Sequence, residues 1–437
     1  MLSTTTINDH PPGSGAPLFS AVLKSEPADF IVDEVLGFDL DGAGEHLYLN
    51  IQKTGVNTDE IARLLETVFS VTSKDVGVSG MKDRHAVTSQ WFSVTTPLGS
   101  KLMQTALDEF RQDHKHAKII NEARHSRKLR RGAHAGNDFV ITLRGVRVVD
   151  AGAEDAQELD IDSGSNGAAS GEGTGAASGE GTGAASSGGT VEASGAGAVE
   201  QSGASIPVTG PEGDSSEGAN MATTTNLEVA VSQRIQWIST HGFPNYIGPQ
   251  RFGIGGQNLV RARQWFRQPK KRTSRQQRSL WLSAGRSAIF NAVCAARVAD
   301  GSWQQLLAGE PAVLSGTRSF FDSSDVSAEE LSARLKSFDI HPSAPWWGRG
   351  RALATQACAD YEQALLEPFA DICGGLEKGG LSQERRAIRA AATDLTHQWI
   401  DGTTLELSFN LPPGVFATTL MSELGLCEEP VRPRFNN

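Results

Sequence analysis

The chain contains 437 residues, 38% of them hydrophobic, and its formal net charge at pH 7 is −11. This length is enough for two or three domains. The sequence has neither a run of about 20 apolar residues nor a basic N-terminal region followed by an apolar one, so we expect no transmembrane helix and no secretory signal. The cysteines Cys294, Cys358, Cys373 and Cys427 are widely spaced, which argues against a zinc site and a disulfide framework.

The negative charge is concentrated in one segment. Between Ala151 and Gln233 there are 13 acidic residues and no Lys or Arg, so the rest of the chain is slightly basic. Within this segment the unit GAASGEGT occurs twice from Gly167 to Thr182, and a decayed copy, GAASSGGT, follows. Such a composition cannot bury enough apolar surface to offset its chain entropy. We predict a disordered acidic insert at residues 151–225, and whole-chain charge is then a poor guide to partners.

Before the insert, apolar patterning predicts alternating strands and helices. Runs rich in β-branched and aromatic residues predict strands at 30–35, 46–51, 76–78, 91–95 and 139–149. Asn57 can cap a helix that extends to about Phe69, because apolar residues recur there at helical spacing. A further helix is expected at 102–110.

After the insert, the pattern becomes mainly helical. Helices are expected at 227–239, 258–267, 284–299, 327–338 and 351–369, followed by a strand at 404–409 and a helix at 415–424. Strands at both ends with a helical middle predict an α+β fold. The middle would be a separate domain inserted into a sheet formed from both ends of the chain.

A polar loop between two of the predicted strands concentrates groups that can carry chemistry. It reads GMKDRHAVTSQWF from Gly80 to Phe92 and contains Lys82, Asp83 and Arg84 in succession. A lone Asp in a turn beside Gly usually makes only a local backbone hydrogen bond. On pattern alone, a structural role for this loop is therefore favoured.

A second segment, FPNYIGPQRFGIGG from Phe243 to Gly256, alternates aromatic residues with Gly, Pro, Asn, Gln and Arg. Flexible backbone beside aromatic rings and Arg suits close approach to a nucleic-acid strand. The segment is neither a Walker loop nor a dinucleotide fingerprint. A tightly turned structural loop fits the same pattern equally well.

Two basic clusters lie outside the acidic insert. Their members are Arg124, Arg127, Lys128, Arg130 and Arg131, and then Arg267, Lys270, Lys271, Arg272, Arg275 and Arg278. Such clusters neutralise phosphates, although each alone is equally compatible with a solvated surface. Two of them in a nearly neutral body favour a nucleic-acid partner.

The polar loop, GMKDRHAVTSQWFSV, resembles the active-site loop of the TruD family of tRNA pseudouridine synthases, and FPNYIGPQRFGIGG resembles that family's second signature. The similarity continues in the family's order through ADFIVDEVLGFDLDGAGEHLYLNIQKTGVNT, RHSRKLRRGAHAGNDFVITLRGV, SLWLSAGRSAIFNAV and LPPGVFATTLMSEL. It covers about Leu23 to Leu424 without the insert, and it is weakest from Gly309 to Trp347.

The resemblance implies a pseudouridine-synthase-like catalytic domain with a mixed or antiparallel sheet, and an inserted, mostly helical α/β domain, the TRUD domain. We expect a flexible tail at residues 1–20 and the TRUD domain at 242–386. The catalytic domain would comprise residues 21–150, 226–241 and 387–437.

The resemblance also assigns site residues. Asp83 corresponds to the family's catalytic aspartate, and Lys24 to a lysine that pairs with it. The positions that line the uridine pocket correspond to Phe30, Asn137, Phe139 and Phe416. Phe139 would stack on the base, and Asn137, two residues earlier on a strand, would point to the same face.

The chemistry of pseudouridine formation agrees with these residue types. The reaction breaks the N1–C1′ bond, rotates the uracil and joins C5 to C1′. One carboxylate can act as nucleophile or general base, and a nearby cation such as Lys24 favours its ionised form. A flipped-out base would gain about 1–3 kcal/mol by stacking on an aromatic ring. We expect a monomeric cytoplasmic isomerase of the uridine at position 13, with tRNA as partner and with no cofactor, metal or membrane.

Two other functions compete with this hypothesis. An RNA-binding or tRNA-folding protein without relevant catalysis would use the same basic clusters, but it would not need Asp83, Lys24 and Phe139 together. A carboxylate-based nucleoside hydrolase would need a second positioned acid. Glu34 is the nearby candidate, and an ion-paired strand carboxylate is the alternative interpretation of that residue.

Overall fold

The computed structural model describes residues 10–96, 101–149, 215–268 and 273–430. Residues 150–214 of the predicted acidic insert therefore lie outside the described residues, as do residues 1–9 of the predicted tail and 270–272 of the second basic cluster. Residues 1–149 and 222–437 form one compact unit. The elements described below belong to this unit, except that the helix Ser215–His241 begins before residue 222. Among the described helices, none combines the length and the apolar composition that crossing a membrane requires.

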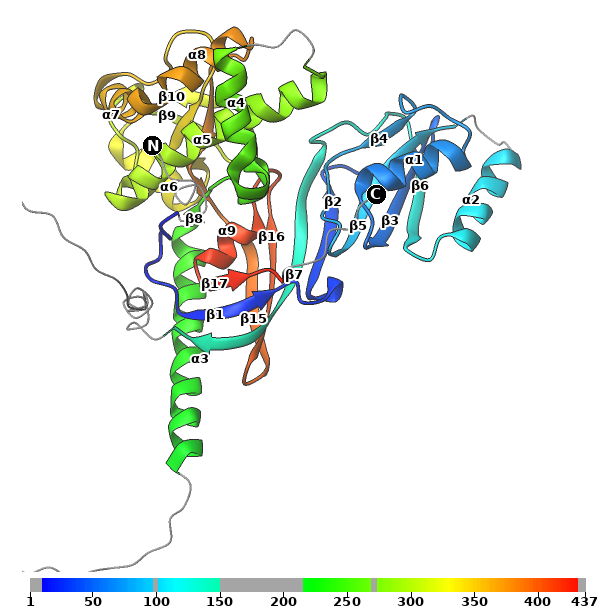
Figure 1. The fold of residues 1–437 in the computed structure, drawn as a ribbon, viewed down its shortest axis with the longest axis horizontal. Coiled ribbons are helices and arrows are strands. Elements are labelled where there is room, and N and C mark those ends of the chain that lie inside the picture. Colours follow the sequence, from blue (N-terminus) through cyan, green and yellow to red (C-terminus); the bar gives the residue numbers. More distant parts are fainter. Residues whose placement is uncertain (1–9, 97–100, 150–214, 269–272, 431–437) are drawn as a thin grey trace, which may run out of the picture. The chain divides into compact units, whose positions relative to one another are not determined.

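A ten-stranded mixed sheet unites the two ends of the chain. Along its main path the order is β15-β16-β7-β2-β5-β3-β6, while β1 pairs with β17 and β7, and β4 pairs with β5. In Figure 1 the blue strand β1 lies beside the red strand β17, and the two are parallel. The strands are β1 (Phe19–Leu23), β2 (Phe30–Leu36), β3 (His46–Thr54), β4 (Val76–Val78), β5 (Val87–Thr95), β6 (Ala117–His125), β7 (His134–Val148), β15 (Thr393–Asp401), β16 (Thr404–Leu411) and β17 (Gly425–Glu428).

Two apolar clusters stabilise this sheet. The first joins inward residues of β7 and β16, such as Ile141 and Leu407, to Val231 and Ile235 of α3 (Ser215–His241). The second joins β3 and β5 to α1 (Thr58–Val68) and α2 (Lys101–Asp113). Asn57 and Glu60 form a capping box at the start of α1, which confirms the predicted cap.

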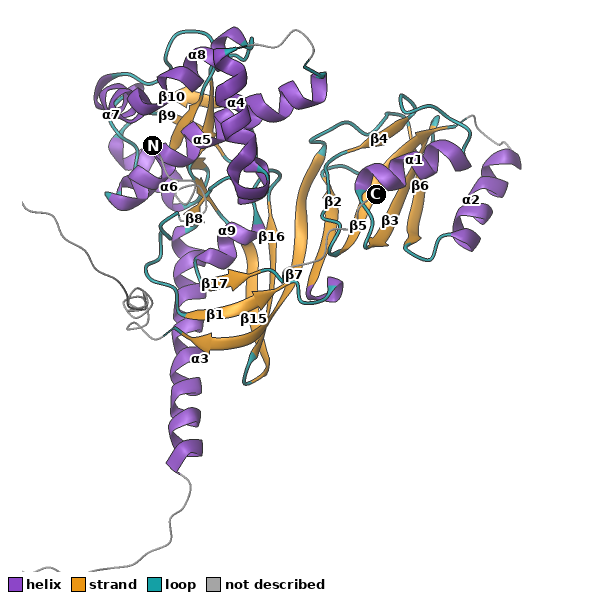
Figure 2. Ribbon diagram, viewed as in Figure 1, coloured by secondary structure: helices purple, strands orange, loops and turns teal. Residues whose placement is uncertain are grey.

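The region between β8 and β14 is mainly helical, with short strands (Figure 2). Its helices are α4 (Gln257–Arg267), α5 (Arg275–Ala299), α6 (Ala328–Lys336), α7 (Gln356–Leu366) and α8 (Ala370–Lys378). Its strands pair as β8 (Phe243–Pro244) with β14 (Arg389–Ala390), β12 (Ser343–Trp346) with β13 (Glu384–Ala387), and β9 (Pro311–Leu314) between β10 (Phe320–Asp322) and β11 (Ile340–His341).

Short 3-10 helices and one α-helix complete the fold. These are η2 (Pro27–Asp29), η3 (Pro249–Phe252), η4 (Ile254–Gly256), η5 (Ser302–Gln304), η6 (Ser323–Asp325), η7 (Glu367–Phe369) and α9 (Ala417–Ser422). The predicted α+β class, with a sheet drawn from both ends of the chain, is confirmed. The β8–β14 pair brings the two ends of the helical region together, as an inserted domain requires; its predicted boundaries, 242 and 386, stay a prediction.

Some elements differ from the sequence prediction. Strands β1, β6, β15 and β17 were not predicted, and the helix expected from Arg351 begins at Gln356. β6 and β15 are polar strands with at most one buried residue each, and they lie at the two ends of the main sheet path. Neither face of such a strand has to be apolar. Its sequence therefore lacks the alternation of apolar and polar residues that marks a half-buried strand.

Residues of the predicted tail contact the rest of the compact unit. The main-chain N–H groups of Gly13 and Ser14 donate to the Glu423 carboxylate at 3.0 and 2.8 Å, and the Tyr246 hydroxyl donates to the Pro11 carbonyl at 3.1 Å. Glu423 is fully buried, so it requires such donors. Composition could not reveal this contact, because the acceptor lies 410 residues further along the chain.

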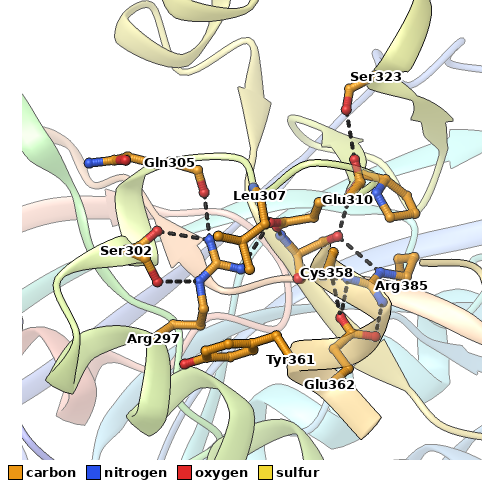
Figure 3. Close-up of polar contacts among 12 residues, drawn as sticks. Arg297, Ser302, Gln305, Leu307, Glu310, Ser323, Cys358, Tyr361, Glu362 and Arg385 are labelled. Atoms are coloured by element: carbon orange, nitrogen blue, oxygen red, sulfur yellow. Dashed lines mark hydrogen bonds and ion pairs between the residues drawn. The ribbon is translucent and has the colours of Figure 1, made fainter. Parts of the chain in front are cut away.

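Two buried ion pairs cross-link the helical region (Figure 3). Arg297 on α5 contacts Glu310 at 2.9 Å, with side chains 1% and 0% exposed. Arg385 on β13 contacts Glu362 on α7 at 2.7 Å, with side chains 1% and 9% exposed. Ser343 connects the two pairs, because its main-chain N–H donates to Glu310 and its hydroxyl accepts from Arg385.

Candidate active site

The polar loop that links β4 to β5 is held by hydrogen bonds on its backbone. The Gly80 carbonyl accepts from Gln90 at 2.5 Å, and the Lys82 N–H donates to the Thr58 hydroxyl at 3.0 Å. The main-chain carbonyl of Asp83 accepts from the Lys53 ammonium at 3.0 Å. These bonds fix the loop against β5, α1 and β3. The backbone position of Asp83 is therefore well defined.

The structure brings Asp83 and Lys24 together, as predicted. The Lys24 Nζ lies 3.2 Å from Asp83 Oδ2 and 2.8 Å from Glu429 Oε1. The Lys24 side chain is 3% exposed, whereas those of Asp83 and Glu429 are 36% and 44% exposed. A covered ammonium thus faces two carboxylates that solvent and a substrate can reach.

Lys24 occupies an unusual backbone conformation directly after β1. Its φ is +57°, in the left-handed region that residues other than glycine adopt at a cost of about 1–3 kcal/mol. Its ammonium also lies 4.5 Å from the centroid of the Phe30 ring, a favourable cation–π geometry. Lys24 thus combines a strained backbone with an ammonium that contacts the Phe30 ring and the carboxylates of Asp83 and Glu429.

Phe139 belongs to an aromatic cluster. Its ring lies 6.0 Å from that of Phe30 in an edge arrangement, and it stacks on Phe409 at 5.2 Å with an interplanar angle of 19°. Phe139 is 8% exposed. Phe409 therefore occupies one face of the ring, and a base stacking on Phe139 would have to use the other face.

Asn137 and Glu34 meet at the ammonium of Lys82. Lys82 Nζ donates to Asn137 Oδ1 and to Glu34 Oε2, each at 2.7 Å. The Glu34 side chain is 0% exposed, and its other oxygen accepts from the Trp91 N–H at 3.2 Å. Glu34 is therefore the ion-paired strand carboxylate of the alternative interpretation, and it does not face solvent as the second acid of a hydrolase would.

Phe416 lies in a neighbouring cavity of about 580 Å³. The cavity is lined by parts of the FPNYIGPQRFGIGG segment, by α9 and by Glu429. Phe416 also packs closely against Gly248, where a Cβ would come within 3.3 Å of its ring. Asp83 and Phe139 are not among the lining residues. Glu429 lines the cavity and contacts Lys24, which in turn contacts Asp83 of the polar loop.

Comparisons with known proteins place the chain in a family. The family model described as "tRNA pseudouridine synthase D (TruD)" matches residues 14–165 and 256–424. This chain belongs to the TruD family.

Relatives with the same description align along nearly the whole chain. The tRNA pseudouridine synthase D of Aeromonas hydrophila is 35% identical over 415 residues, which are 95% of this chain and 93% of that protein. The Methylococcus capsulatus protein is 34% identical over 418 residues, or 95% of this chain and 94% of that protein. The crystal structure of the putative TruD from Methanosarcina mazei has a TM-score of 0.54 and 16% identity, covering 96% of this chain and 97% of that one, which supports the fold.

In this TruD-family chain, sequence reasoning missed Lys53. Its side chain is buried, and its ammonium donates to the carbonyls of Val56 and Asp83 at 2.9 and 3.0 Å. Burial lowers the pKa of Lys53 to about 8, although the nearby Asp83 carboxylate favours the charged form. A signal was present: Lys53 continues the inward-facing set of Leu49 and Ile51 on β3, where a charge is unexpected.

The first basic cluster lies beside the polar loop that carries Asp83. Arg127, Arg130 and Arg131 are exposed in the connection between β6 and β7. This connection is bonded to the start of the loop, because the Gly132 N–H donates to the Ser79 carbonyl at 2.8 Å. Arg124 instead donates to the carbonyl of Thr96 at 3.1 Å. The exposed members therefore present positive charge to solvent near the loop.

The contacts above join five of the six predicted site residues. Lys24 links Asp83 to Phe30, and Phe30 contacts Phe139. Asn137 is joined through Lys82, the residue before Asp83. Phe416 lies apart from them, in the neighbouring cavity.

Proposed function

We propose that this chain converts the uridine at position 13 of tRNA to pseudouridine, with Asp83 as its catalytic carboxylate. The observation that carries the proposal is the Asp83 carboxylate, which is 36% exposed on a fixed loop and contacts the buried ammonium of Lys24. The relatives' names, tRNA pseudouridine synthase D, describe pseudouridine formation in tRNA, which supports the proposal.

In the proposed reaction, Asp83 acts on the nucleotide as nucleophile or general base. The N1–C1′ bond breaks, the uracil turns in place, and C5 joins C1′. The proton lost from C5 is balanced by the proton gained at N1, so the conversion is an isomerisation that needs no second substrate. Lys24 would hold the Asp83 carboxylate through its ion pair, and Phe30, Asn137, Phe139 and Phe416 would line the uridine pocket.

We propose that the exposed arginines of the β6–β7 connection bind the tRNA backbone. Three exposed guanidinium groups, those of Arg127, Arg130 and Arg131, would neutralise phosphates and make the affinity depend on salt. We also propose that the chain acts in the cytoplasm as a monomer. All four cysteines are free, which suits a reducing compartment.

Asp83→Asn tests the catalytic assignment. Purified protein is incubated with an unmodified tRNA transcript, and pseudouridine is mapped at nucleotide resolution as its carbodiimide adduct. We expect Asp83→Asn to bind the transcript as the unsubstituted chain does and to lose turnover by a factor of about 10⁴ or more. Asp33→Asn, which alters an exposed carboxylate on β2, is the matched control.

The outcomes separate the two leading hypotheses. Turnover retained in Asp83→Asn would refute the assignment of Asp83. Binding by the unsubstituted chain without any adduct would support an RNA-binding protein instead.

A further inference from the structure

A closed polar cluster lies directly behind the catalytic loop. Glu34 on β2 and Asn137 on β7 are register partners in the sheet, so their side chains stand next to each other on one face. Lys82 reaches over both from the loop, and its side chain is 6% exposed. The mechanism proposed above uses neither Glu34 nor Lys82, although Lys82 precedes Asp83 directly.

The donors and acceptors of this cluster match one another. An ammonium group can only donate hydrogen bonds, and two of its protons go to Glu34 Oε2 and Asn137 Oδ1 at 2.7 Å each. Glu34 Oε1 accepts from the Trp91 N–H at 3.2 Å. Bonds of this length with a charged donor are among the strong ones in proteins, so the positions of the two oxygens facing Lys82 are well defined.

This arrangement determines which way the Asn137 amide points. An amide has one accepting oxygen and one NH₂ group, and the two are hard to tell apart unless a neighbour decides. The Lys82 ammonium decides, since it tolerates only the oxygen on its side. The NH₂ group of Asn137 is therefore directed away from Lys82.

We propose that Lys82, supported by Glu34, is a positioning residue that makes Asn137 a hydrogen-bond donor toward a carbonyl oxygen of the target uracil. The inference rests on the proposed function, because it takes Asn137 as part of the uridine pocket. Uracil offers two carbonyl acceptors, and a donor fixed by a covered ammonium would hold the ring without reorganising. One residue of the loop would thereby orient the base, and the next, Asp83, would act on it.

Asn137→Asp tests the direction of the amide. Aspartate has nearly the same shape and still accepts from Lys82, but it has no proton to donate. We expect the melting temperature to be maintained and kcat/KM to fall about 10- to 100-fold, because a buried carbonyl acceptor loses its donor. A change below twofold would overturn the proposal, since Asn137 would then contact the base through its oxygen or not at all.

Lys82→Met tests whether Lys82 acts through Asn137. We expect unchanged tRNA affinity, a kcat reduced about 10-fold or more at saturating tRNA, and a smaller additional loss when Asn137→Asp is combined with it. An equal loss from Asn137→Asp in both backgrounds would overturn the proposal. A purely structural role would lower the melting temperature and leave kcat of the folded enzyme unchanged, which would also overturn it.

Two further variants keep this test decisive. Lys82→Met leaves Glu34 as a buried unpaired charge, so if it does not fold, Lys82→Met with Glu34→Gln replaces it in the same comparison. Lys118→Met, which removes an exposed lysine from β6, is the control for loss of positive charge. If the unsubstituted chain forms no pseudouridine, the proposed function fails, whereas loss confined to the variants concerns the positioning role alone.

Discussion

Buried cations occur in two regions of this molecule, and they differ in how their carboxylate partners are covered. In the helical region, Arg297 and Glu310 are both within 1% of complete burial, and the network around them is closed (Figure 3). In the region around Asp83, the Lys24 side chain is only 3% exposed, but its partners Asp83 and Glu429 are 36% and 44% exposed.

Both partners are buried in the helical region, whereas the carboxylates paired with Lys24 remain accessible, so only the second arrangement can present a carboxylate to a substrate. The oxygens of Glu310 accept from Arg297, Leu307 and Ser343, which leaves no approach for a substrate. Asp83 presents part of its carboxylate outward. Both side chains of the Lys82–Glu34 pair are buried, as in the pairs of the helical region, although Lys82 directly precedes Asp83.

The largest effect that we expect is a loss of stability when the buried Arg297–Glu310 ion pair is broken. Glu310→Gln leaves the guanidinium of Arg297 buried without a counter-charge, and such a change costs about 3–5 kcal/mol. Denaturant unfolding followed by fluorescence measures this loss. Replacing both partners, as in Arg297→Met with Glu310→Met, should cost less than the single change. If Glu310→Gln unfolds at the same midpoint as the unsubstituted chain, the closed network is not a stability element.

Lys24→Met should have the complementary effect, on activity more than on stability. Removal of the ammonium takes away the charged hydrogen-bond donor of Asp83 and leaves that carboxylate near Glu429 without a cation between them. We expect kcat to fall about 10²-fold or more, while unfolding changes less than in Glu310→Gln because both carboxylates can be hydrated. Single-turnover assays at saturating tRNA measure the chemical step. Full activity in Lys24→Met would remove the ammonium from the mechanism.

From the lowered pKa of Lys53 we expect activity and stability to depend on pH in opposite directions. Its ammonium faces Asp83, Lys82 and Glu60, and its pKa is lowered to about 8 from 10.5 by burial. As pH rises through about 8, Lys53 loses the positive charge that faces the Asp83 carboxylate and binds the Asp83 main-chain carbonyl, so kcat/KM should decline on the alkaline side.

The stability contribution of Lys53 has the opposite sign. Between pH 8 and 10.5 the unfolded chain holds a proton that the folded chain has released, so this group alone makes stability rise with pH. A pH–rate profile of Lys53→Met should lack the decline near pH 8, at a lower plateau. A decline that persists in that variant, or that follows loss of the fold, would contradict the role of Lys53.

The sequence predicted the parts of this site that lie in continuous motifs. Asp83 and Lys24 were assigned from the TruD resemblance, and the strand that carries Phe139 from its alternating pattern. Phe409 was not found, because its stack on Phe139 depends on the register between β16 and β7. Glu429 was not found either, because it meets Lys24 across 405 residues of chain.

The fold was predictable where one face of a strand is buried. β2 and β3 have that pattern, whereas β6 and β15 are largely exposed and polar. Lys53 shows the reverse case, since a charge on the apolar face of a strand is a signal that pattern analysis can use.

The smallest effect that we expect is on kcat/KM when Glu429 is substituted. This change compares the two carboxylates that contact Lys24. Its bond to Lys24 is shorter than that of Asp83, 2.8 Å against 3.2 Å, so distance alone would rank Glu429 as the more important partner. The side chain is 44% exposed, and an exposed ion pair contributes only about 0.2–1 kcal/mol. Glu429→Gln should therefore change kcat/KM less than about fivefold, measured beside Lys24→Met in the same assay. A loss as large as that of Lys24→Met would mean that the ammonium needs both carboxylates, and Glu429 would then act together with Asp83.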